Sequence, residues 1–230
     1  MRFRRHEIYY YNTKAGFETE KFAGRLLMMI LEGMQEKRKT EILFLCIGTD
    51  RSTGDSLGPL IGYKLKEKGM RNARVLGTLE EPVHAMNLEP CMEQLREKCP
   101  DALVVAVDAS VGSADHVGYV TLGRGPLKPG LGVSKDLDAV GDLFITGIVG
   151  SVRNGDPLML QSVRLSVVMR LADCISRSIC LGMNLLGKRV ENFLDSRPRF
   201  DRFCKRPMVY FHLSHKGKTG GQARPSRGRI

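Results

Sequence analysis

Two short, uninterrupted apolar runs limit what this chain of 230 residues can fold into. The run ILFLCI at residues 42–47 ends at Gly48, and the run ALVVAV at 102–107 ends at Asp108. Runs of this length are typical of strands that are buried on both faces, as in a parallel sheet. Parallel strands need a crossover between them, and amphipathic segments separate these runs. We therefore predict an α/β fold with a mostly parallel central sheet.

Apolar periodicity assigns the remaining elements. Further strands are predicted at 73–78, 117–122 and 143–149, and helices at 17–37, 56–68, 88–98 and 157–183. Gly182 and Gly187 are expected to mark the end of the last helix. The segment MVYFHL at 208–213 is a further candidate for a local strand.

The formal charge of +11 is concentrated near the C-terminus. Residues 185–230 contain 12 Lys and Arg against 3 Asp and Glu, which leaves 24 against 22 in the rest of the chain. We predict an N-terminal extension with an amphipathic helix (1–40), an α/β domain (41–184) and a basic, poorly ordered tail (185–230). The tail could contact nucleic acid or an acidic protein, but it lacks the aromatic interleaving of single-strand binders, which favours a solvated extension.

Composition excludes several functional classes. Six cysteines without a C-x-x-C motif or Cys/His clusters predict neither a disulfide framework nor a structural zinc site. No apolar run reaches the ~18 residues of a membrane span, and the first residues contain no apolar signal region, so we expect a cytoplasmic protein without membrane contact. Cys46 lies in a predicted buried strand and the serines lack a G-x-S-x-G setting, so no thiol or serine nucleophile is predicted.

The loop after the first buried strand carries the clearest chemical signal. Its sequence, GTDRSTGDSLG at 48–58, leads into a helix, where α/β folds place phosphate loops or catalytic groups. A phosphate loop has Lys after its second glycine, whereas this chain has Asp55, whose charge would repel an anion. Nucleotide binding is therefore disfavoured. Asp55 either caps the following helix or takes part in a reaction.

Asp108 is predicted at the carboxyl end of the other apolar strand. If the two strands are neighbours, Asp55 and Asp108 face each other across one crevice. Two close carboxyl groups resist joint ionisation, so one can activate water as a carboxylate while the other, still protonated, polarises a carbonyl group. The alternative for Asp108 is a turn-capping role after the strand.

Other residues are weaker candidates. Asp50 in the same loop and Glu81 after the second strand could bind a metal or be solvated, and His84 is expected near the same crevice. In a later Gly/Pro-rich loop, Gly130 and Gly132 could present backbone N–H groups to an oxyanion, or form a plain turn.

Across roughly residues 40–182, these motifs resemble the YyaC-type sporulation proteins of spore-forming bacteria. The matching runs are FLCIGTDRSTGDSLGPLIGYKLKEKG, TLEEPVHAMNL, PDALVVAVDASVG and KPGLGVSKDL. That group is in turn similar to the spore germination protease and, in fold, to the hydrogenase maturation endopeptidases. The resemblance implies a three-layer α/β/α sandwich, phosphorylase/hydrolase-like and of the hydrogenase maturation protease type.

The resemblance also implies which residues act. The two essential aspartates of the germination protease correspond to Asp55 and Asp108. In the hydrogenase maturation enzymes the acidic pair binds a metal together with a histidine from the Pro-Gly loop, where this chain has Lys135 nearby and no histidine. We therefore expect no cofactor, and the alternative of a divalent metal at the aspartate pair stays open.

Two functional hypotheses follow. The first is an aspartate-dependent endopeptidase of the sporulation or germination programme, acting in the mother cell, forespore or spore core on protein substrates such as small acid-soluble spore proteins. Backbone groups near Gly130 or Gly132, with Lys135 close by, would stabilise the oxyanion. The second is a non-catalytic sporulation protein that uses the fold as a binding module, its tail contacting DNA or an acidic partner. Either could act as an oligomer.

Overall fold

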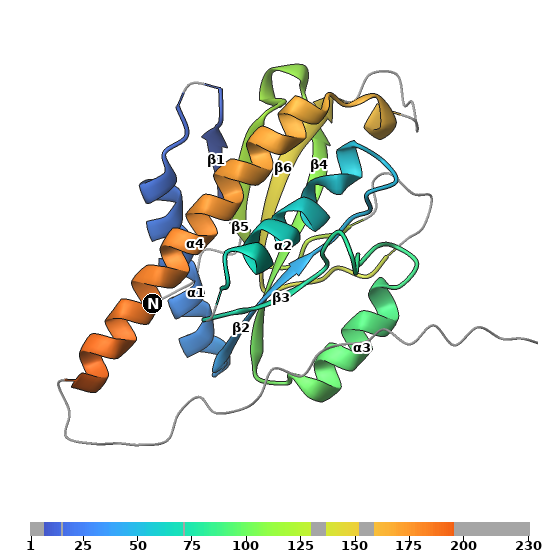
Figure 1. Ribbon diagram of the computed structural model, residues 1–230. Helices are drawn as coiled ribbons and strands as arrows, with labels where there is room; N and C mark the ends of the chain where they lie inside the picture. The colour runs from blue at the N-terminus through green and yellow to red at the C-terminus, as the bar shows by residue number, and fades with distance from the viewer. Residues whose placement is uncertain (1–6, 15, 71, 130–136, 152–158, 196–230) are drawn as a thin grey trace, which may run out of the picture.

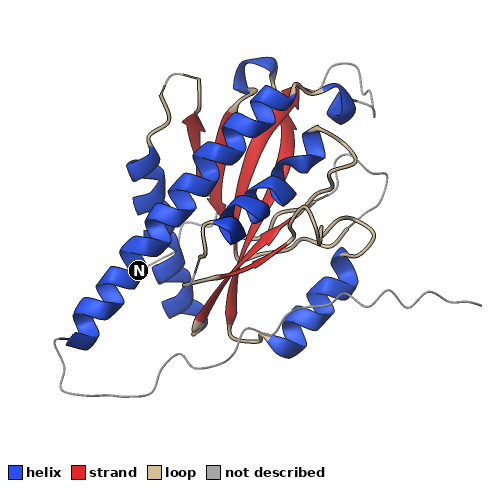
Figure 2. Cartoon of the chain, viewed as in Figure 1, coloured by secondary structure: helices blue, strands red, loops and turns tan. Residues whose placement is uncertain are grey.

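Helices cover both faces of a six-stranded sheet in the computed structural model of the chain, which describes residues 7–14, 16–70, 72–129, 137–151 and 159–195 (Figures 1 and 2). One apolar core lies under each face. This arrangement is a three-layer α/β/α sandwich, so the predicted fold class is confirmed.

The strands lie side by side in the order β1-β5-β6-β4-β2-β3. Their bounds are β1 Ile8–Asn12, β2 Glu41–Cys46, β3 Arg74–Leu76, β4 Ala102–Gly112, β5 Tyr119–Arg124 and β6 Leu143–Ser151. β3, β2, β4 and β6 are parallel, whereas β5 and β1 are antiparallel to their neighbours. The two apolar runs are therefore neighbours, and Cys46 is opposite Val107.

Three helices pack on one face of the sheet and one helix packs on the other. Helices α1 (Thr19–Lys37), α2 (Leu57–Glu67) and α4 (Leu165–Asp195) share the larger core, and α3 (Leu88–Lys98) packs in the smaller one. Short 3-10 turns lie at η1 (Gly54–Ser56), η2 (Ala114–His116) and η3 (Met159–Ser162). Side chains of β2 alternate between the cores, with Phe44 in the larger and Leu43 and Leu45 in the smaller, as expected for a strand buried on both faces.

The N-terminal residues contribute a strand that the sequence patterns did not predict. β1 pairs with β5, placing Ile8 opposite Gly123, and α1 buries Phe22 and Leu26 in the larger core. The expected boundary at residue 40 therefore does not separate these residues from the sheet, and the one at 184 falls within α4. β1 was missed because it is short and is held by a strand distant in sequence.

Helix α4 begins and ends later than the predicted span of 157–183. The prediction that Gly182 and Gly187 end the helix is wrong, because both lie inside it. A Cβ at Gly182 would lie 3.3 Å from the carbonyl oxygen of Ala23 in α1, so this glycine permits a close helix crossing. The strand candidate at 208–213 and the rest of the tail from 196 lie outside the described residues.

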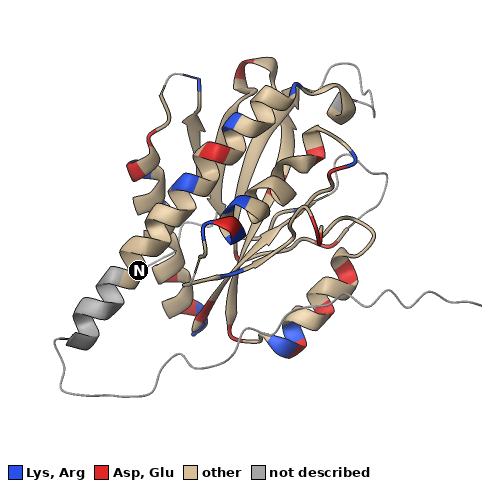
Figure 3. Ribbon diagram, in the orientation of Figure 1, with Lys and Arg blue, Asp and Glu red and all other residues tan. Residues whose placement is uncertain are grey.

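Acidic and basic residues are both scattered over the described helices in the view of Figure 3, among a majority of uncharged residues. One pair of opposite charge links two helices, since Lys64 of α2 lies 2.9 Å from Asp173 of α4. Within the described ranges, no helix combines the length and apolar character needed to cross a bilayer.

Helix α2 lies very close to β2 and β3 because glycines face the strands. A Cβ at Gly62 would lie 1.9 Å from the carbonyl oxygen of Gly77, and one at Gly58 would lie 2.0 Å from that of Ile47. These distances are far below van der Waals contact, so only a hydrogen atom fits at either position. The start of α2 is therefore pressed against the carboxyl end of β2.

Replacing Gly62 with Ala is expected to destabilise the fold by about 3 kcal/mol, because the helix must move away from β3 to admit a methyl group. The matched control is Gly24→Ala in α1, where nothing lies within 4 Å of the added Cβ. That substitution should be neutral or stabilising by about 0.5–1 kcal/mol, because Ala favours helix more than Gly does. Urea unfolding of both variants checks this contrast, and equal effects would contradict it.

Candidate active site

The carboxyl ends of β2 and β4 form the topological switch point of the sheet. From β2 the chain continues through α2 to β3 on one side, whereas from β4 it continues to β5 and β6 on the other. Ligands of open α/β sheets bind in the crevice at such a point. Asp55 reaches it from η1, which packs against β4, and Asp108 belongs to β4 itself.

Backbone contacts hold the loop between β2 and α2. The N–H of Thr49 donates to the carbonyl oxygen of Asp55 at 3.1 Å. A Cβ at Gly48, where φ is +143°, would lie 2.0 Å from that same oxygen, and a Cβ at Gly54 would lie 2.8 Å from the carbonyl oxygen of Leu160. The loop is closed on itself and packed against η3, which fixes the backbone of Asp55.

Asp55 does not cap the helix that follows it. The residues preceding η1 and α2 are Thr53 and Ser56, and neither helix start has a side-chain capping hydrogen bond. Partial burial raises the pKa of the Asp55 carboxyl, whereas hydrogen bonding from the neighbouring Ser52 hydroxyl lowers that pKa. The Ser52 oxygen is itself buried and has no partner at full hydrogen-bond geometry among the described residues.

Asp108 lies inside β4, so the prediction that it ends the strand is wrong. β4 continues to Gly112 along β6. The pairing of β2 with β4 stops at Cys46 and Val107, and the N–H of Ile47 then donates to the carbonyl oxygen of Val107 at 2.7 Å. Asp108 is thus the first residue of β4 beyond its pairing with β2. This position places its carboxyl beside the loop that carries Asp55.

Burial strongly perturbs the Asp108 carboxyl. The residue is 9% exposed, and its Oδ1 accepts a hydrogen bond from the N–H of Ala109 at 2.7 Å. Loss of hydration, opposed by the hydrogen bond from the Ala109 N–H and aided by the Asp55 charge, raises the pKa of Asp108 to about 8. At pH 7 Asp108 therefore keeps its proton, and Asp55, which is less buried, ionises first. The two carboxyl groups therefore interact electrostatically, and burial favours the protonated form of Asp108 more than that of Asp55.

Three hydroxyl groups extend the site across the sheet. Thr146 of β6 is opposite Asp108 in register. The Thr146 Oγ1 accepts a hydrogen bond from the Ser110 Oγ at 3.1 Å. The same Thr146 oxygen lies 2.6 Å from the Thr121 Oγ1. Side chains at paired positions share one face of a sheet, so this row lies on the face of Asp108. The sequence patterns did not identify these residues. The available signal was that Thr146 carries the one polar side chain in the run LFITGIV.

The weaker candidates have other partners or are exposed. Asp50 is exposed, and Glu81 is exposed and lies 3.8 Å from the ammonium group of Lys66. The ring Nδ1 of His84 accepts the N–H of Met86 at 3.2 Å, which gives the ring a local turn role. The hydrogen bonds and ion pairs found for these three residues do not involve Asp55 or Asp108. The oxyanion candidates lie outside the described residues: Gly130, Gly132 and Lys135.

The donor set at the site is two carboxyl groups. In the described part of the chain, no three His, Cys, Asp or Glu side chains gather as a metal site would require. Two carboxylates alone are hard oxygen ligands, which suit Mg²⁺ rather than a nickel-type centre. Burial also raises the pKa of the Cys46 thiol, which agrees with its exclusion as a nucleophile.

Fold and site together define a three-layer α/β/α protein with one buried and one partly buried aspartate at the switch point of its sheet. The chain belongs to the family described as "Protein of unknown function (DUF1256)", whose model matches residues 8–178. It is 43% identical over 164 residues to "Uncharacterized protein YyaC" of Bacillus subtilis (strain 168), which covers 71% of this chain and 80% of that protein. The predicted resemblance to YyaC-type proteins is thereby confirmed.

The chain is also similar to chains of known structure. One of them is the [NiFe] hydrogenase maturation protease HycI from Thermococcus kodakarensis KOD1, which is 19% identical to this chain. The superposition covers 65% of this chain and 98% of that one, with a TM-score of 0.40.

Replacing Asp108 with Asn is expected to stabilise the protein at high pH. Because the folded state raises the pKa of Asp108, the folded protein binds this proton more tightly than the unfolded chain, and stability is lost as pH rises from about 4 toward about 8. The Asn variant should avoid that loss and gain on the order of 2–4 kcal/mol over the wild type at pH 8, with the difference shrinking toward pH 4.

Urea unfolding of the wild type and the Asn variant across this pH range checks the prediction. The exposed Asp50→Asn provides a control with the same change of charge and no expected gain. A stability difference between the wild type and Asp108→Asn that does not vary with pH would contradict the burial account.

Proposed function

We propose that the protein is an endopeptidase in which Asp55 and Asp108 activate water for direct attack on a peptide bond. The observation that supports the proposal is the buried carboxyl of Asp108, whose pKa is raised by loss of hydration and by the nearby charge of Asp55. A carboxylate that can accept a proton beside a carboxylic acid that can donate one is the arrangement that general acid–base hydrolysis needs.

The roles follow from the two environments. Asp55 is the less buried group and has Ser52 beside it, so it acts as the base and takes a proton from water. The water oxygen then bonds to the peptide carbonyl carbon, while Asp108 donates its proton to the carbonyl oxygen. When the C–N bond breaks, the proton on Asp55 passes to the leaving amine, and Asp108 regains its own proton from the hydroxyl of the intermediate. The pair ends as it began, with one proton.

The choice of a peptide bond rests on chemistry and on motif resemblance. An acidic pair repels phosphate esters, which argues against a phosphoryl substrate. The motifs that contain Asp55 and Asp108 resemble those of the spore germination protease. The sporulation setting, and small acid-soluble spore proteins as substrates, rest on that same resemblance.

Asp55→Asn and Asp108→Asn should each lower cleavage by about 100-fold or more, because each removes one proton-transfer group. The assay incubates the purified full chain with a small acid-soluble spore protein and identifies cut sites by intact mass. Asp50→Asn, a charge-matched change in the same loop, should cleave like the wild type. Parallel reactions with EDTA and with added Mg²⁺ test whether a metal takes part. Unchanged cleavage by both Asn variants would refute the proposal.

The rate should depend on pH in a bell shape. Raising the pH through about 8 removes the proton of Asp108, so kcat/KM should fall there; lowering the pH should protonate Asp55 and also reduce the rate. A kcat/KM profile between pH 4 and pH 10 measures both limbs, over a range chosen to bracket the ordinary and raised values. A rate that keeps rising above pH 9 would exclude Asp108 as the acid.

A further inference from the structure

Among the described residues, strand β1 leaves one edge of the sheet without a strand partner. It is the last strand in the order and pairs with β5 alone (Figure 1). Its sequence, IYYYN, contains neither a proline nor a lysine, and its pairing with β5 shows no register shift. Proline, lysine and register shifts are among the devices by which natural proteins keep an edge strand from pairing with another chain. As far as the described residues go, the edge is therefore available for a further strand.

The backbone groups at this edge can be assigned. The N–H of Thr13 donates to the carbonyl oxygen of Gly118 at 3.2 Å, which continues the register between β1 and β5. Such bonds alternate along an antiparallel pair, so the N–H and C=O groups of Ile8, Tyr10 and Asn12 point away from β5. This set of three residues is symmetric about Tyr10.

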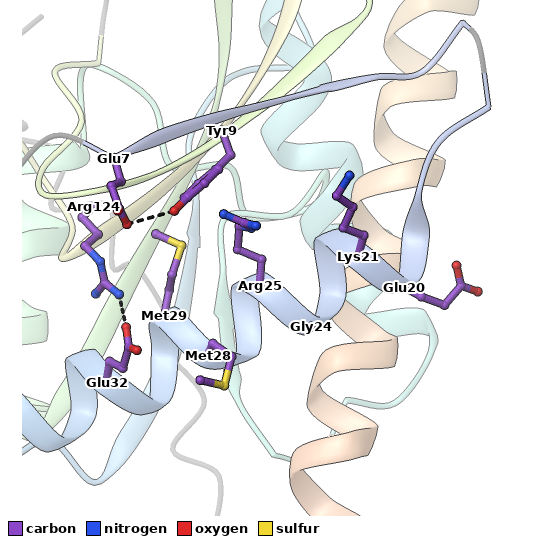
Figure 4. A pocket seen from close by; sticks show the side chains of 10 residues that line it. All are labelled: Glu7, Tyr9, Glu20, Lys21, Gly24, Arg25, Met28, Met29, Glu32 and Arg124. Atoms are coloured by element: carbon purple, nitrogen blue, oxygen red, sulfur yellow. Dashed lines mark hydrogen bonds and ion pairs between the residues drawn. The ribbon is translucent and has the colours of Figure 1, made fainter. Parts of the chain in front are cut away.

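Exposed apolar side chains lie near this edge on both faces of the sheet, because Ile8 and Tyr10 alternate along β1 with tyrosines that pack on the α1 side. Seven large apolar side chains are exposed among the described residues, and three of them lie on β1 and α1, namely Ile8 (46%), Tyr10 (56%) and Met28 (55%). Between the strand and the helix is a pocket of about 400 Å³, shown in Figure 4. The guanidinium of Arg25 lies over the Tyr9 ring there, 3.7 Å from its centroid. Apolar exposure on both sides of an edge strand favours a contact along that edge.

One stripe of α1 beside the pocket carries both signs of charge. It consists of Lys21, Arg25, Met28 and Glu32, spaced so that they share one side of the helix. Within the chain, Lys21 pairs with Glu18 at 3.1 Å, and Glu32 pairs with Arg124 of β5. Two such stripes in antiparallel orientation place Lys21 opposite the partner's Glu32, and Arg25 opposite the partner's Met28. The stripe is therefore complementary to itself.

We propose that two copies of this chain form a two-fold symmetric dimer through β1. The two β1 strands pair antiparallel, with Tyr10 opposite the partner's Tyr10 and Ile8 opposite the partner's Asn12, so that the two sheets become one. The contact of Tyr9 with Arg25 places the middle of β1 at the level of the middle of the α1 stripe. One two-fold axis can therefore serve the strand contact and the helix contact together.

A second copy fits this edge better than an unrelated extended peptide. A peptide could satisfy the outward backbone groups, since strand addition is a general mode of recognition. An unrelated peptide would not in general carry charges complementary to the α1 stripe, which is positive at one end and negative at the other. A two-fold contact requires that property, because each residue meets its counterpart across the axis.

Sedimentation velocity of the full chain over a wide concentration range tests the proposal, and the expected species has twice the chain mass of 25.6 kDa. Tyr10→Pro removes the central outward N–H and the exposed ring, and proline is tolerated on edge strands, so the variant should remain folded and become monomeric. Tyr63→Ala, which removes an exposed tyrosine of α2, should leave the dimer unchanged.

A cysteine cross-link tests the register and does not depend on the proline variant folding. In a hydrogen-bonded antiparallel pair the Cα atoms lie about 5.5 Å apart, within the range of a disulfide. Tyr10→Cys should therefore form a covalent dimer under mild oxidation, and Tyr63→Cys and the wild type should not.

Three outcomes would overturn the proposal. One is a monomer at every concentration, and another is a dimer that survives Tyr10→Pro and does not cross-link through Tyr10→Cys. The third is a monomer whose β1 amides gain protection from hydrogen exchange only when unstructured casein is added, which would assign the edge to an extended peptide. None of these results depends on whether the protein cleaves a substrate.

Discussion

The close approach of α2 to the sheet is the contact on which the site depends. At Gly58 and Gly62 the helix meets the carbonyl oxygens of Ile47 and Gly77 at distances that leave no room for a Cβ. This contact fixes where the helix starts. Together with the closed loop before it, the contact holds Asp55 at the carboxyl end of β2, next to the strand that carries Asp108. A methyl group at either glycine would move the start of α2, and with it the loop that carries Asp55, relative to the sheet.

The position of Asp108 is costly for folding and useful for chemistry. A carboxyl group in a buried strand loses its hydration, and the protein limits the cost by keeping it protonated. The large core under α1, α2 and α4, with fully buried side chains such as Phe22 and Phe44, offsets what remains. A buried acid that lowers stability at the switch point of a sheet is typical of sites whose perturbed pKa serves a reaction.

Local sequence patterns predict much of this fold, and the features they miss depend on pairing between distant segments. A strand buried on both faces and a helix buried along one stripe each have a recognisable apolar pattern in the sequence. The predicted bounds of β2, α1 and α3 therefore agree with the structure within one or two residues. The edge strand β1 leaves a weaker trace because its partner is distant in sequence and it is half exposed. The same limit applies within the site. Asp55 and Asp108 follow recognisable apolar runs, whereas the extension of β4 past Asp108 and the hydroxyl row through Thr146 depend on the register with β6.

The most direct test of this account is a titration of the aspartate side chains by ¹³C NMR, in the wild type and in Asp55→Asn. We expect one carboxyl group to titrate near the pKa of about 8 assigned to Asp108, and this resonance should be absent from Asp108→Asn. In Asp55→Asn the same group should titrate at lower pH, because the neighbouring charge is gone. If every aspartate of the folded wild type titrates within the ordinary range of about 3–5, Asp108 does not keep its proton at neutral pH, and the acid–base site is contradicted.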